Sequence, residues 1–329
     1  MCAPILGCSG AGSLREFPRE TTVELVSQID PNGFGAPFAG GRIVDIAAGP
    51  DGSLLLAAIQ PGQVIDLSPE GRVVWAKDGS ETRVGQFQGP GLILSRARDA
   101  FYLVDSGTGR VHRFGADGTL QEEVALSVAL DAAASPGGEL FVFPNTTGFL
   151  LDVFDAQSRY LRSIVPLPGE PVDLSFLGCL LLPDPDGGVF ALWNPSRTIY
   201  RLGPEGERKA EFKVDPPDLV SNLEERLRRV HERAAQAGLV GTINPFLDLT
   251  TDEEGRLAAL YLFERFESEV SSTEETQPTR DAAVYRFTTG GRAVDVIRGF
   301  GNITRVVFMG GEVYGLDREA NRILRFRFR

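Results

Sequence analysis

The stretch FYLVDSGTGRVHRFGADGTL, Phe101 to Leu120, decides the fold. A β-rich run is followed by a turn with two glycines, a second alternating run and another turn at Asp117-Gly118, which is the pattern of a β-hairpin with its exit turn. Similar pairs of turns, about nineteen residues apart, recur at Pro50-Asp51-Gly52 with Pro69-Glu70-Gly71 and at Asp186-Gly187 with Glu205-Gly206. A hairpin repeated in this way predicts a repeat architecture.

Each repeat contains four β-type runs, because one run precedes each hairpin and another follows it. The first turns lie near residues 51, 98, 137, 186, 253 and 310, which indicates six units. Four-stranded units repeated around a ring form a propeller. The sequence therefore predicts an all-β protein, a six-bladed β-propeller of four-stranded antiparallel blades over residues 21–329.

The last unit contains only three runs, in GGEVYGLDREANRILRFRFR at the C-terminal end of the sequence. The run TTVELVSQI, Thr21 to Ile29, alternates like a strand and precedes the first unit. We expect it to supply the missing strand and close the ring, which removes the exposed sheet edges. In this strand Val23, Leu25 and Ser27 are expected to share one face.

Two segments resemble the NHL repeat, in which an apolar run ends in Asp and is followed by a small polar turn and Arg-Ile/Val. They are FYLVDSGTGRVHRF and EVYGLDREANRILRF. The resemblance implies a six-bladed NHL-like propeller. It implies no single activity, since such propellers serve as binding scaffolds and, in related families, as metal-dependent lactonases and lyases.

Two insertions interrupt the repeat. Residues 215–238, between the fourth and fifth units, have helical periodicity, with Ser221 and Glu224 at capping-box spacing. This helix either packs on the rim of the propeller or forms a lid over the channel mouth. Residues 264–281 are acidic, rich in Ser and Thr and poor in apolar side chains, so they predict an extended hairpin tip.

The formal net charge of −12 argues against nucleic acid and anionic lipid surfaces as partners, because a negative field repels both. The three cysteines, Cys2, Cys8 and Cys179, form no CxxC pair, so a structural zinc site is not expected. No apolar run approaches the roughly 18 residues of a membrane span. We expect a soluble monomer.

Carboxylates occur at equivalent positions of alternate units. Counting back seven residues from the end of each first turn gives Asp45, Leu92, Asp131, Leu181, Asp248 and Thr304. Three acids facing one axial space would suit Ca²⁺ or Mg²⁺. The alternative is that each Asp caps neighbouring backbone amides.

The two histidines argue against catalysis, because His112 falls in a predicted strand and His231 on the inserted helix, so they are not expected to form a general-base pair.

The N-terminal residues 1–20 are expected to form a tether. The tetrapeptide Ile5 to Cys8 resembles the lipobox of bacterial lipoproteins, which implies lipidation of Cys8. Only seven residues precede Cys8, which is too short for a secretory signal. The expected localisation is therefore the bacterial cell envelope, either membrane-anchored or periplasmic, if the start codon is misplaced. Otherwise we expect the protein in the cytoplasm.

The sequence favours a non-enzymatic binding or scaffold propeller that holds a protein, peptide or glycan at one face or at the channel mouth, with no cofactor. The protein would contact the membrane only through the lipid anchor. The alternative function is a divalent-metal-dependent, lactonase-like hydrolase or lyase, in which Asp45, Asp131 and Asp248 hold the metal ion.

Overall fold

The computed structural model describes most of the chain. The described residues are 19–34, 41–49, 52–83, 85–88, 92–96, 100–126, 129–144, 149–157, 159–166, 178–236, 244–265 and 279–329. The lipobox-like Cys8 and residues 266–278 of the acidic segment 264–281 lie outside these residues.

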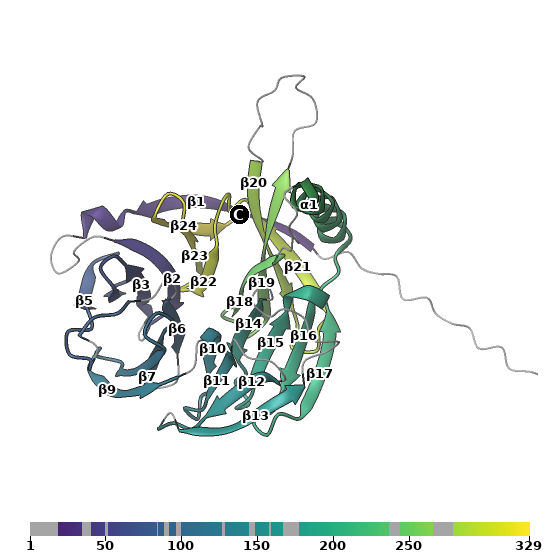
Figure 1. Cartoon of the computed structure of the whole chain (residues 1–329). Coiled ribbons are helices and arrows are strands. Elements are labelled where there is room, and N and C mark those ends of the chain that lie inside the picture. The colour runs from purple at the N-terminus through teal and green to yellow at the C-terminus, as the bar shows by residue number, and fades with distance from the viewer. Residues whose placement is uncertain are drawn as a thin grey trace, which may run out of the picture.

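Four of the sheets are separate antiparallel meanders of four strands (Figure 1). The first contains β2 (Arg42–Ala48), β3 (Leu54–Ile59), β4 (Gln63–Leu67) and β5 (Val73–Lys77). The second contains β6 (Leu92–Arg96), β7 (Ala100–Asp105), β8 (Arg110–Gly115) and β9 (Leu120–Ala125). The third contains β10 (Ala129–Ala134), β11 (Leu140–Pro144), β12 (Phe149–Phe154) and β13 (Tyr160–Pro166). The fourth contains β14 (Cys179–Pro183), β15 (Val189–Trp193), β16 (Thr198–Leu202) and β17 (Arg208–Lys213).

The remaining sheet has eight strands. In spatial order these are β18 (Phe246–Thr251), β19 (Leu257–Arg265), β20 (Thr279–Phe287), β21 (Ala293–Arg298), β1 (Arg19–Ile29), β24 (Arg322–Phe328), β23 (Glu312–Asp317) and β22 (Arg305–Met309). The sequence predicts six separate four-stranded sheets, and this one differs because β1 pairs on both sides. It is antiparallel to β24 and parallel to β21.

The sheets are arranged in a ring, which makes the protein an all-β propeller (Figure 1). The inner strands β2, β6, β10, β14, β18 and β22 contact one another in that order, and β22 contacts β2 again. The second strands of the sheets are buried almost throughout, as in β3, β7 and β23. They read as continuous apolar runs because a neighbouring sheet covers each face, whereas outer strands such as β17 alternate.

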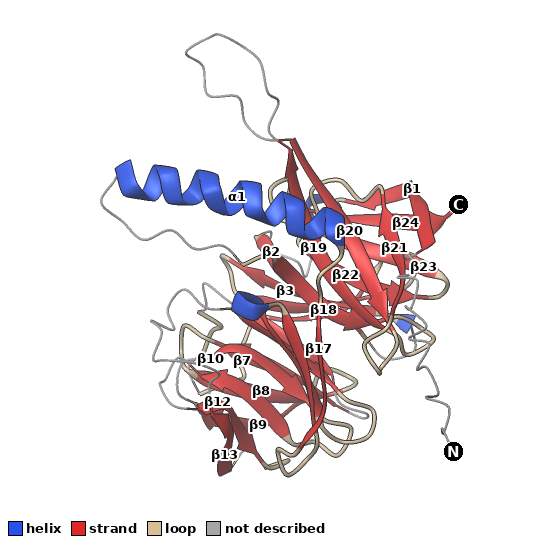
Figure 2. Ribbon diagram, turned by 90° about the vertical axis from the view of Figure 1, so that its right-hand side faces the viewer, coloured by secondary structure: helices blue, strands red, loops and turns tan. Residues whose placement is uncertain are grey.

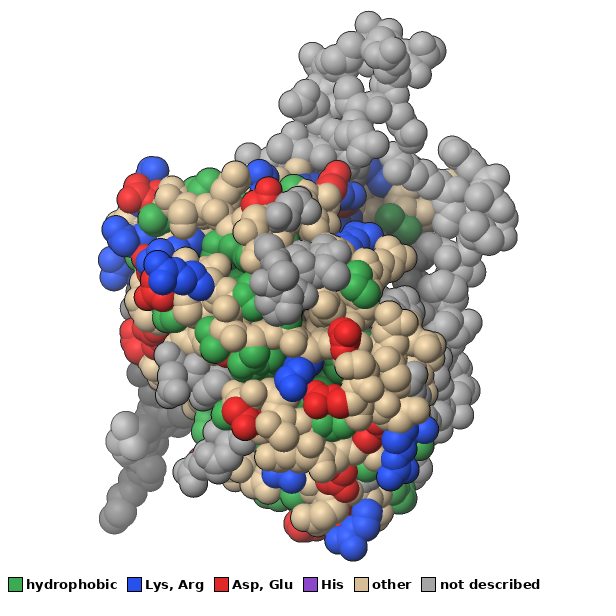
Figure 3. Space-filling view, turned by 90° about the vertical axis from the view of Figure 1, so that its left-hand side faces the viewer, with side chains coloured by type: hydrophobic (Ala, Val, Ile, Leu, Met, Phe, Trp, Pro, Cys, Tyr) green, Lys and Arg blue, Asp and Glu red, His purple; other side chains and the backbone are tan. Residues whose placement is uncertain are grey.

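The hydrophobic core is divided among the spaces between neighbouring sheets. Ile43, Leu56 and Ile65 of the first sheet, for example, form one cluster with Leu316 and Ile323 of the eight-stranded sheet. On the outer face shown in Figure 3, acidic and basic side chains are interspersed, and the described residues form no large patch of one charge there.

The helix α1 (Pro217–Gln236) follows β17 and precedes β18. It begins at Pro217, so Ser221 lies inside the helix and the capping box predicted at that residue is wrong. Proline is favoured in the first turn because its missing N–H has no partner there in any case. Leu219 and Leu223 are buried in a core cluster with residues of β18, β19 and β20. The C-terminal end of α1 projects beyond the sheets (Figure 2). Two short 3-10 turns occupy Pro31–Gly33 and Asn194–Ser196. No helix among the described residues is long and apolar enough to cross a membrane.

The pairing of β1 with β24 confirms that the N-terminal run joins the last strands of the chain. Val23 pairs with Phe328 and Ile29 with Ile323. Val23 is buried, but Leu25 is 55% exposed, so the predicted shared face is only partly formed. A register shift between Leu25 and Ser27 interrupts the alternation of side chains.

The closing strand provides a test of how the ring is held. Val23→Ala should lower the free energy of unfolding by about 2 kcal/mol, because Val23 packs in the core cluster of β20 and β24. Leu25→Ala is the matched control and should change it by less than about 0.5 kcal/mol, because Leu25 is exposed. Chemical denaturation measures both values. Equal effects of the two substitutions would contradict the assigned closure.

Candidate axial site

The three candidate aspartates occupy the same local structure in three inner strands. The register of β2 shifts between Ile43 and Asp45, that of β10 between Ala129 and Asp131, and that of β18 between Phe246 and Asp248. Each Asp therefore follows a β-bulge, which reorients the side chain that comes after the extra residue. The described pairings of β6, β14 and β22 show no such shift.

Each of these carboxylates accepts a hydrogen bond from the backbone of the next inner strand. The Oδ2 atoms lie 2.9 Å from the nitrogen of Leu94 for Asp45, 2.8 Å from that of Leu181 for Asp131 and 2.7 Å from that of Val306 for Asp248. In Asp131 and Asp248 the other oxygen accepts from the following backbone N–H, at 2.9 and 3.0 Å. The alternative that each Asp caps neighbouring backbone amides is the arrangement found.

Arg305, at the start of β22, is the central cation that the sequence analysis missed. Its Nε donates to Oδ1 of Asp45 at 2.9 Å, and its Nη1 donates to the carbonyl of Thr304 at 3.1 Å and to that of Leu247. Leu247 is the bulge residue that precedes Asp248. The available signal was a charged residue at the start of the otherwise apolar run RVVFM, one residue after Thr304.

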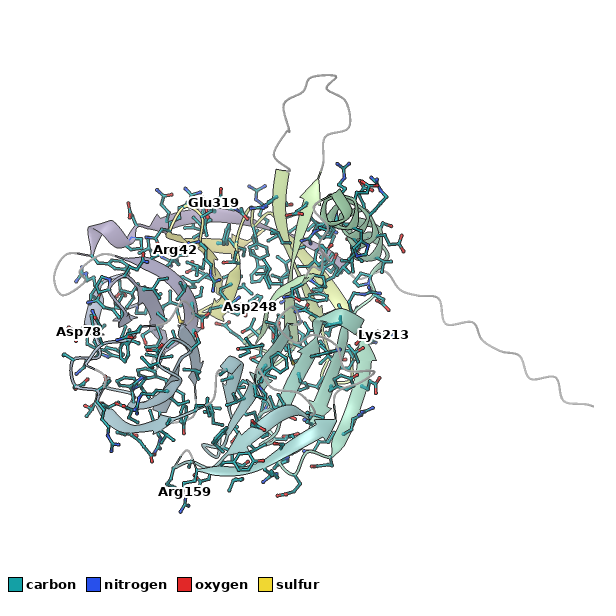
Figure 4. The ribbon with its side chains drawn as sticks, viewed as in Figure 1. Arg42, Asp78, Arg159, Lys213, Asp248 and Glu319 are labelled. Carbon is teal, nitrogen blue, oxygen red and sulfur yellow. The ribbon has the colours of Figure 1, made fainter. Side chains whose placement is uncertain are left out.

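These polar groups line a cavity of about 350 Å³ on the axis of the ring. Asp248 lies at the centre of the ring in Figure 4. Apolar side chains complete the walls, among them Ile46, Leu94, Leu181, Leu249 and Val307. The fold therefore brings Asp45, Asp131 and Asp248, which were predicted from their spacing, to one cavity.

Burial shifts the titration of Asp131 and Asp248. It raises the pKa of Asp131 to about 7 and that of Asp248 to about 6, although backbone N–H donors and Arg305 act in the opposite direction. Burial also opposes the charge of Arg305, but the three aspartates raise the pKa of its guanidinium above the usual value. The cavity therefore holds a fixed cation beside two carboxyl groups that ionise near neutral pH.

The two histidines lie far apart in the architecture, on β8 and α1. His112 is completely buried against Phe87, and neither ring nitrogen has a hydrogen-bond partner among the described residues. Its closest acid is Glu123, whose Oε2 lies 3.8 Å from Nδ1. His231 is exposed. Neither belongs to the axial cavity.

Within the described part of the chain, no group of three or more His, Cys, Asp or Glu side chains is arranged to hold a metal ion. Cys179, at the start of β14, is a buried free thiol whose pKa is raised by burial and by Asp131.

The ring of meander sheets around an axial cavity places the chain in the β-propeller class. No protein-family model matches the sequence, and no curated protein matches it either. Solved structures do match. A member of the DUF4221 family from Bacteroides vulgatus has a TM-score of 0.60 and 9% sequence identity, over 94% of this chain and 98% of that one.

Two further matches cover nearly the whole chain. Virginiamycin B lyase from Staphylococcus aureus has a TM-score of 0.54 and 11% identity, over 93% of this chain and 99% of that one. The β-propeller domain of Swd1 from Myceliophteria thermophila has a TM-score of 0.53 and 12% identity, over 92% and 99%. At these identities the similarity is one of fold alone.

The raised pKa of Asp131 predicts a particular dependence of stability on pH. Between the ordinary value of 3.8 and about 7, the folded state binds more protons at this site than the unfolded state does. The resulting stabilisation is present in full below the unfolded pKa and is lost as the pH rises through about 7. The wild-type protein should therefore lose stability relative to Asp131→Asn as the pH rises from about 5 to about 8.

Melting temperatures of both proteins across this range test the prediction. Asp155→Asn is the control, because the backbone N–H of Arg159 keeps the pKa of Asp155 below its usual value and its titration ends below the tested range. A constant difference between wild type and Asp131→Asn would contradict the raised pKa.

His112 predicts a second, opposite effect at acidic pH. Burial lowers its pKa below the usual value, so the unfolded chain binds a proton at pH values where the folded protein does not. Stability should fall as the pH drops below about 6.5. His112→Phe should remove this component, which is measured as the pH dependence of the denaturation midpoint. If the variant loses stability at acidic pH as the wild type does, His112 is not the source of that loss.

Proposed function

We propose that this protein is a six-bladed, NHL-like propeller that acts as a non-enzymatic binding or scaffold protein and takes a protein, peptide or glycan at the channel mouth. The observation that carries the proposal is the use of the axial carboxylates. Asp45, Asp131 and Asp248 all accept a backbone N–H group of the next inner strand. Groups that hold inner strands together in this way are poorly suited to a catalytic cycle of proton or metal exchange.

The closed cycle of six inner strands supports a count of six blades. On this interpretation the eight-stranded sheet is two blades, β18–β21 and β22–β24 with β1. Four parallel residue pairs, from Arg19 with Asp295 to Thr22 with Arg298, fuse them into one sheet.

The NHL-like character is supported by the two residues at the motif's Asp position. Oδ1 of Asp105 accepts from the backbone nitrogens of Gly107 at 2.9 Å and Thr108 at 3.2 Å. Oδ1 of Asp317 likewise accepts from Ala320 at 3.0 Å. In both repeats the Asp therefore holds the turn between the second and third strands, as an Asx-type turn does.

A divalent cation fits poorly among the axial residues. Ca²⁺ and Mg²⁺ need oxygen atoms that are free to coordinate. Both oxygens of Asp131 and of Asp248 already accept N–H groups, and those of Asp45 are shared between Leu94 and Arg305. Arg305 also places a fixed positive charge beside the same carboxylates. The metal site predicted at these three residues stays a prediction, and the experiment below tests it.

The comparison with virginiamycin B lyase does not favour the hydrolase or lyase alternative. The two proteins share a fold at 11% identity, and one fold can carry either an active site or a binding surface. The choice between a scaffold and a hydrolase or lyase therefore depends on the chemistry of the axial residues.

Calorimetry of the full chain with Ca²⁺, Mg²⁺ and Zn²⁺, combined with assays on panels of lactones and esters, tests the proposal. We expect no saturable heat and no turnover above the uncatalysed rate. Asp131→Ala is the control for any activity that is seen. Metal-dependent turnover in the wild type that disappears in Asp131→Ala would overturn the scaffold proposal.

A further inference from the structure

A groove of about 490 Å³ opens between the first sheet and the turn that joins β23 to β24. It is lined by Gly41, Arg42, Gln60, Arg318, Glu319 and Asn321. Arg42 and Glu319 lie on the same side of the ring in Figure 4. The groove is separate from the axial cavity, and the carbonyl of Val44, next to Asp45, accepts a hydrogen bond from Nη2 of Arg318.

The backbone around the groove is held in a fixed position. Oδ1 of Asn321 accepts from the nitrogen of Ile43 at 2.8 Å, and its Nδ2 donates to the carbonyl of Gly41 at 2.9 Å. These bonds bracket Arg42, so the start of β2 is fixed against the turn that carries Arg318. Gly41 has a φ of +122°, and a Cβ there would lie 2.7 Å from the carbonyl oxygen of Ile59. Only glycine allows this close approach.

The two arginines of the groove differ from most arginines of this acidic chain in their lack of an acidic partner. Arg201 pairs with Asp184, Arg286 with Asp295 and Arg325 with Glu312. Neither Arg42 nor Arg318 forms an ion pair with an acid in the part of the chain that the structure describes. The Nε of Arg318 is buried and has no hydrogen-bond partner among those residues.

The electrostatic surroundings of Arg318 support the same conclusion. Burial, followed by the charges of Arg305 and Arg42, lowers the pKa of its guanidinium to about 10, against the opposing effects of Asp45 and Asp248. The guanidinium of Arg318 is therefore poorly hydrated, and it lies in the positive fields of Arg305 and Arg42 as well as in the negative fields of Asp45 and Asp248. Glu319, the one acid of the groove, is largely exposed and is engaged by Nδ2 of Asn302 at 2.8 Å and by Arg280.

We propose that Arg42, Arg318 and the side-chain amide of Gln60 form an oxyanion site that takes a carboxylate or phosphate group of a ligand. A guanidinium group presents paired N–H donors that match the oxygen atoms of these anions. A bound anion would pair with the exposed guanidinium of Arg42 and would reduce the repulsion between the two arginines. The site depends neither on the number of blades nor on the absence of catalysis.

Titration calorimetry of the full chain with inorganic phosphate and with acetate, at an ionic strength held constant with sodium chloride, tests this site. We expect saturable binding of at least one anion, weakened when the constant ionic strength is set higher, because salt screens the attraction between the anion and the two guanidinium groups. Tighter binding of phosphate would assign the site to phosphoryl groups, and tighter binding of acetate to carboxylates.

Arg42→Gln should weaken this binding by about tenfold or more, since hydrogen bonds to charged groups contribute about 1.5–3 kcal/mol. Arg42 is exposed, so the variant should keep the wild-type melting temperature. Arg318→Gln is a second variant with the same expected loss. Arg159→Gln is the control, because Arg159 is exposed, pairs with Asp155 and lies on the opposite side of the ring (Figure 4).

Two results would overturn the proposal. One is the absence of saturable binding for both phosphate and acetate. The other is an affinity of Arg42→Gln equal to that of the wild type. Neither outcome would bear on the scaffold function, which is judged from metal binding and turnover at the axial cavity.

Discussion

This ring depends on the hydrogen bond that a backbone N–H of one inner strand donates to a carboxylate of the preceding inner strand. Neighbouring sheets of the ring otherwise meet through side chains, which give attraction but little direction. Asp45, Asp131 and Asp248 add directional bonds between alternate pairs of neighbouring inner strands. Asn194 and Asn321 do the same at two of the remaining junctions, through the backbones of Phe246 and Ile43. The inner strands are thereby held at fixed heights along the axis.

The same hydrogen bonds also limit the chemistry that the side chains at the centre of the ring can carry out. A carboxylate that accepts two backbone N–H groups is oriented and buried, and its negative charge is costly to keep. Arg305 offsets part of this cost through Asp45 and through the bulge carbonyl of Leu247. The axial cavity is therefore balanced by its own side chains. Two arginines that form no ion pair among the described residues, Arg42 and Arg318, lie instead near the start of β2, where they line a separate groove.

Most of the architecture could be predicted from the sequence, because each repeat carries its own turn and strand signals. The pairing of Thr21–Ile29 with the last strand followed from a count of missing strands and is confirmed. The prediction that failed there concerns the shared face of Val23, Leu25 and Ser27, because Leu25 is exposed although it pairs in register, and a bulge follows before Ser27. The helix was located, but Pro217 and not Ser221 marks its first turn. Bulges and helix starts depend on single residues, and several residues nearby can give similar signals.

The sequence by itself determined that Asp45, Asp131 and Asp248 recur at equivalent positions, since spacing from a turn is a local property of the chain. It left their role open between metal ligand and backbone cap. Only the tertiary structure supplied Leu94, Leu181 and Val306 as donors, because each lies in a different inner strand from its acceptor, about fifty to sixty residues along the chain. It also placed Arg305 beside Asp45, 260 residues away in sequence. Contacts made by closing a ring join distant residues, so no local pattern can encode them.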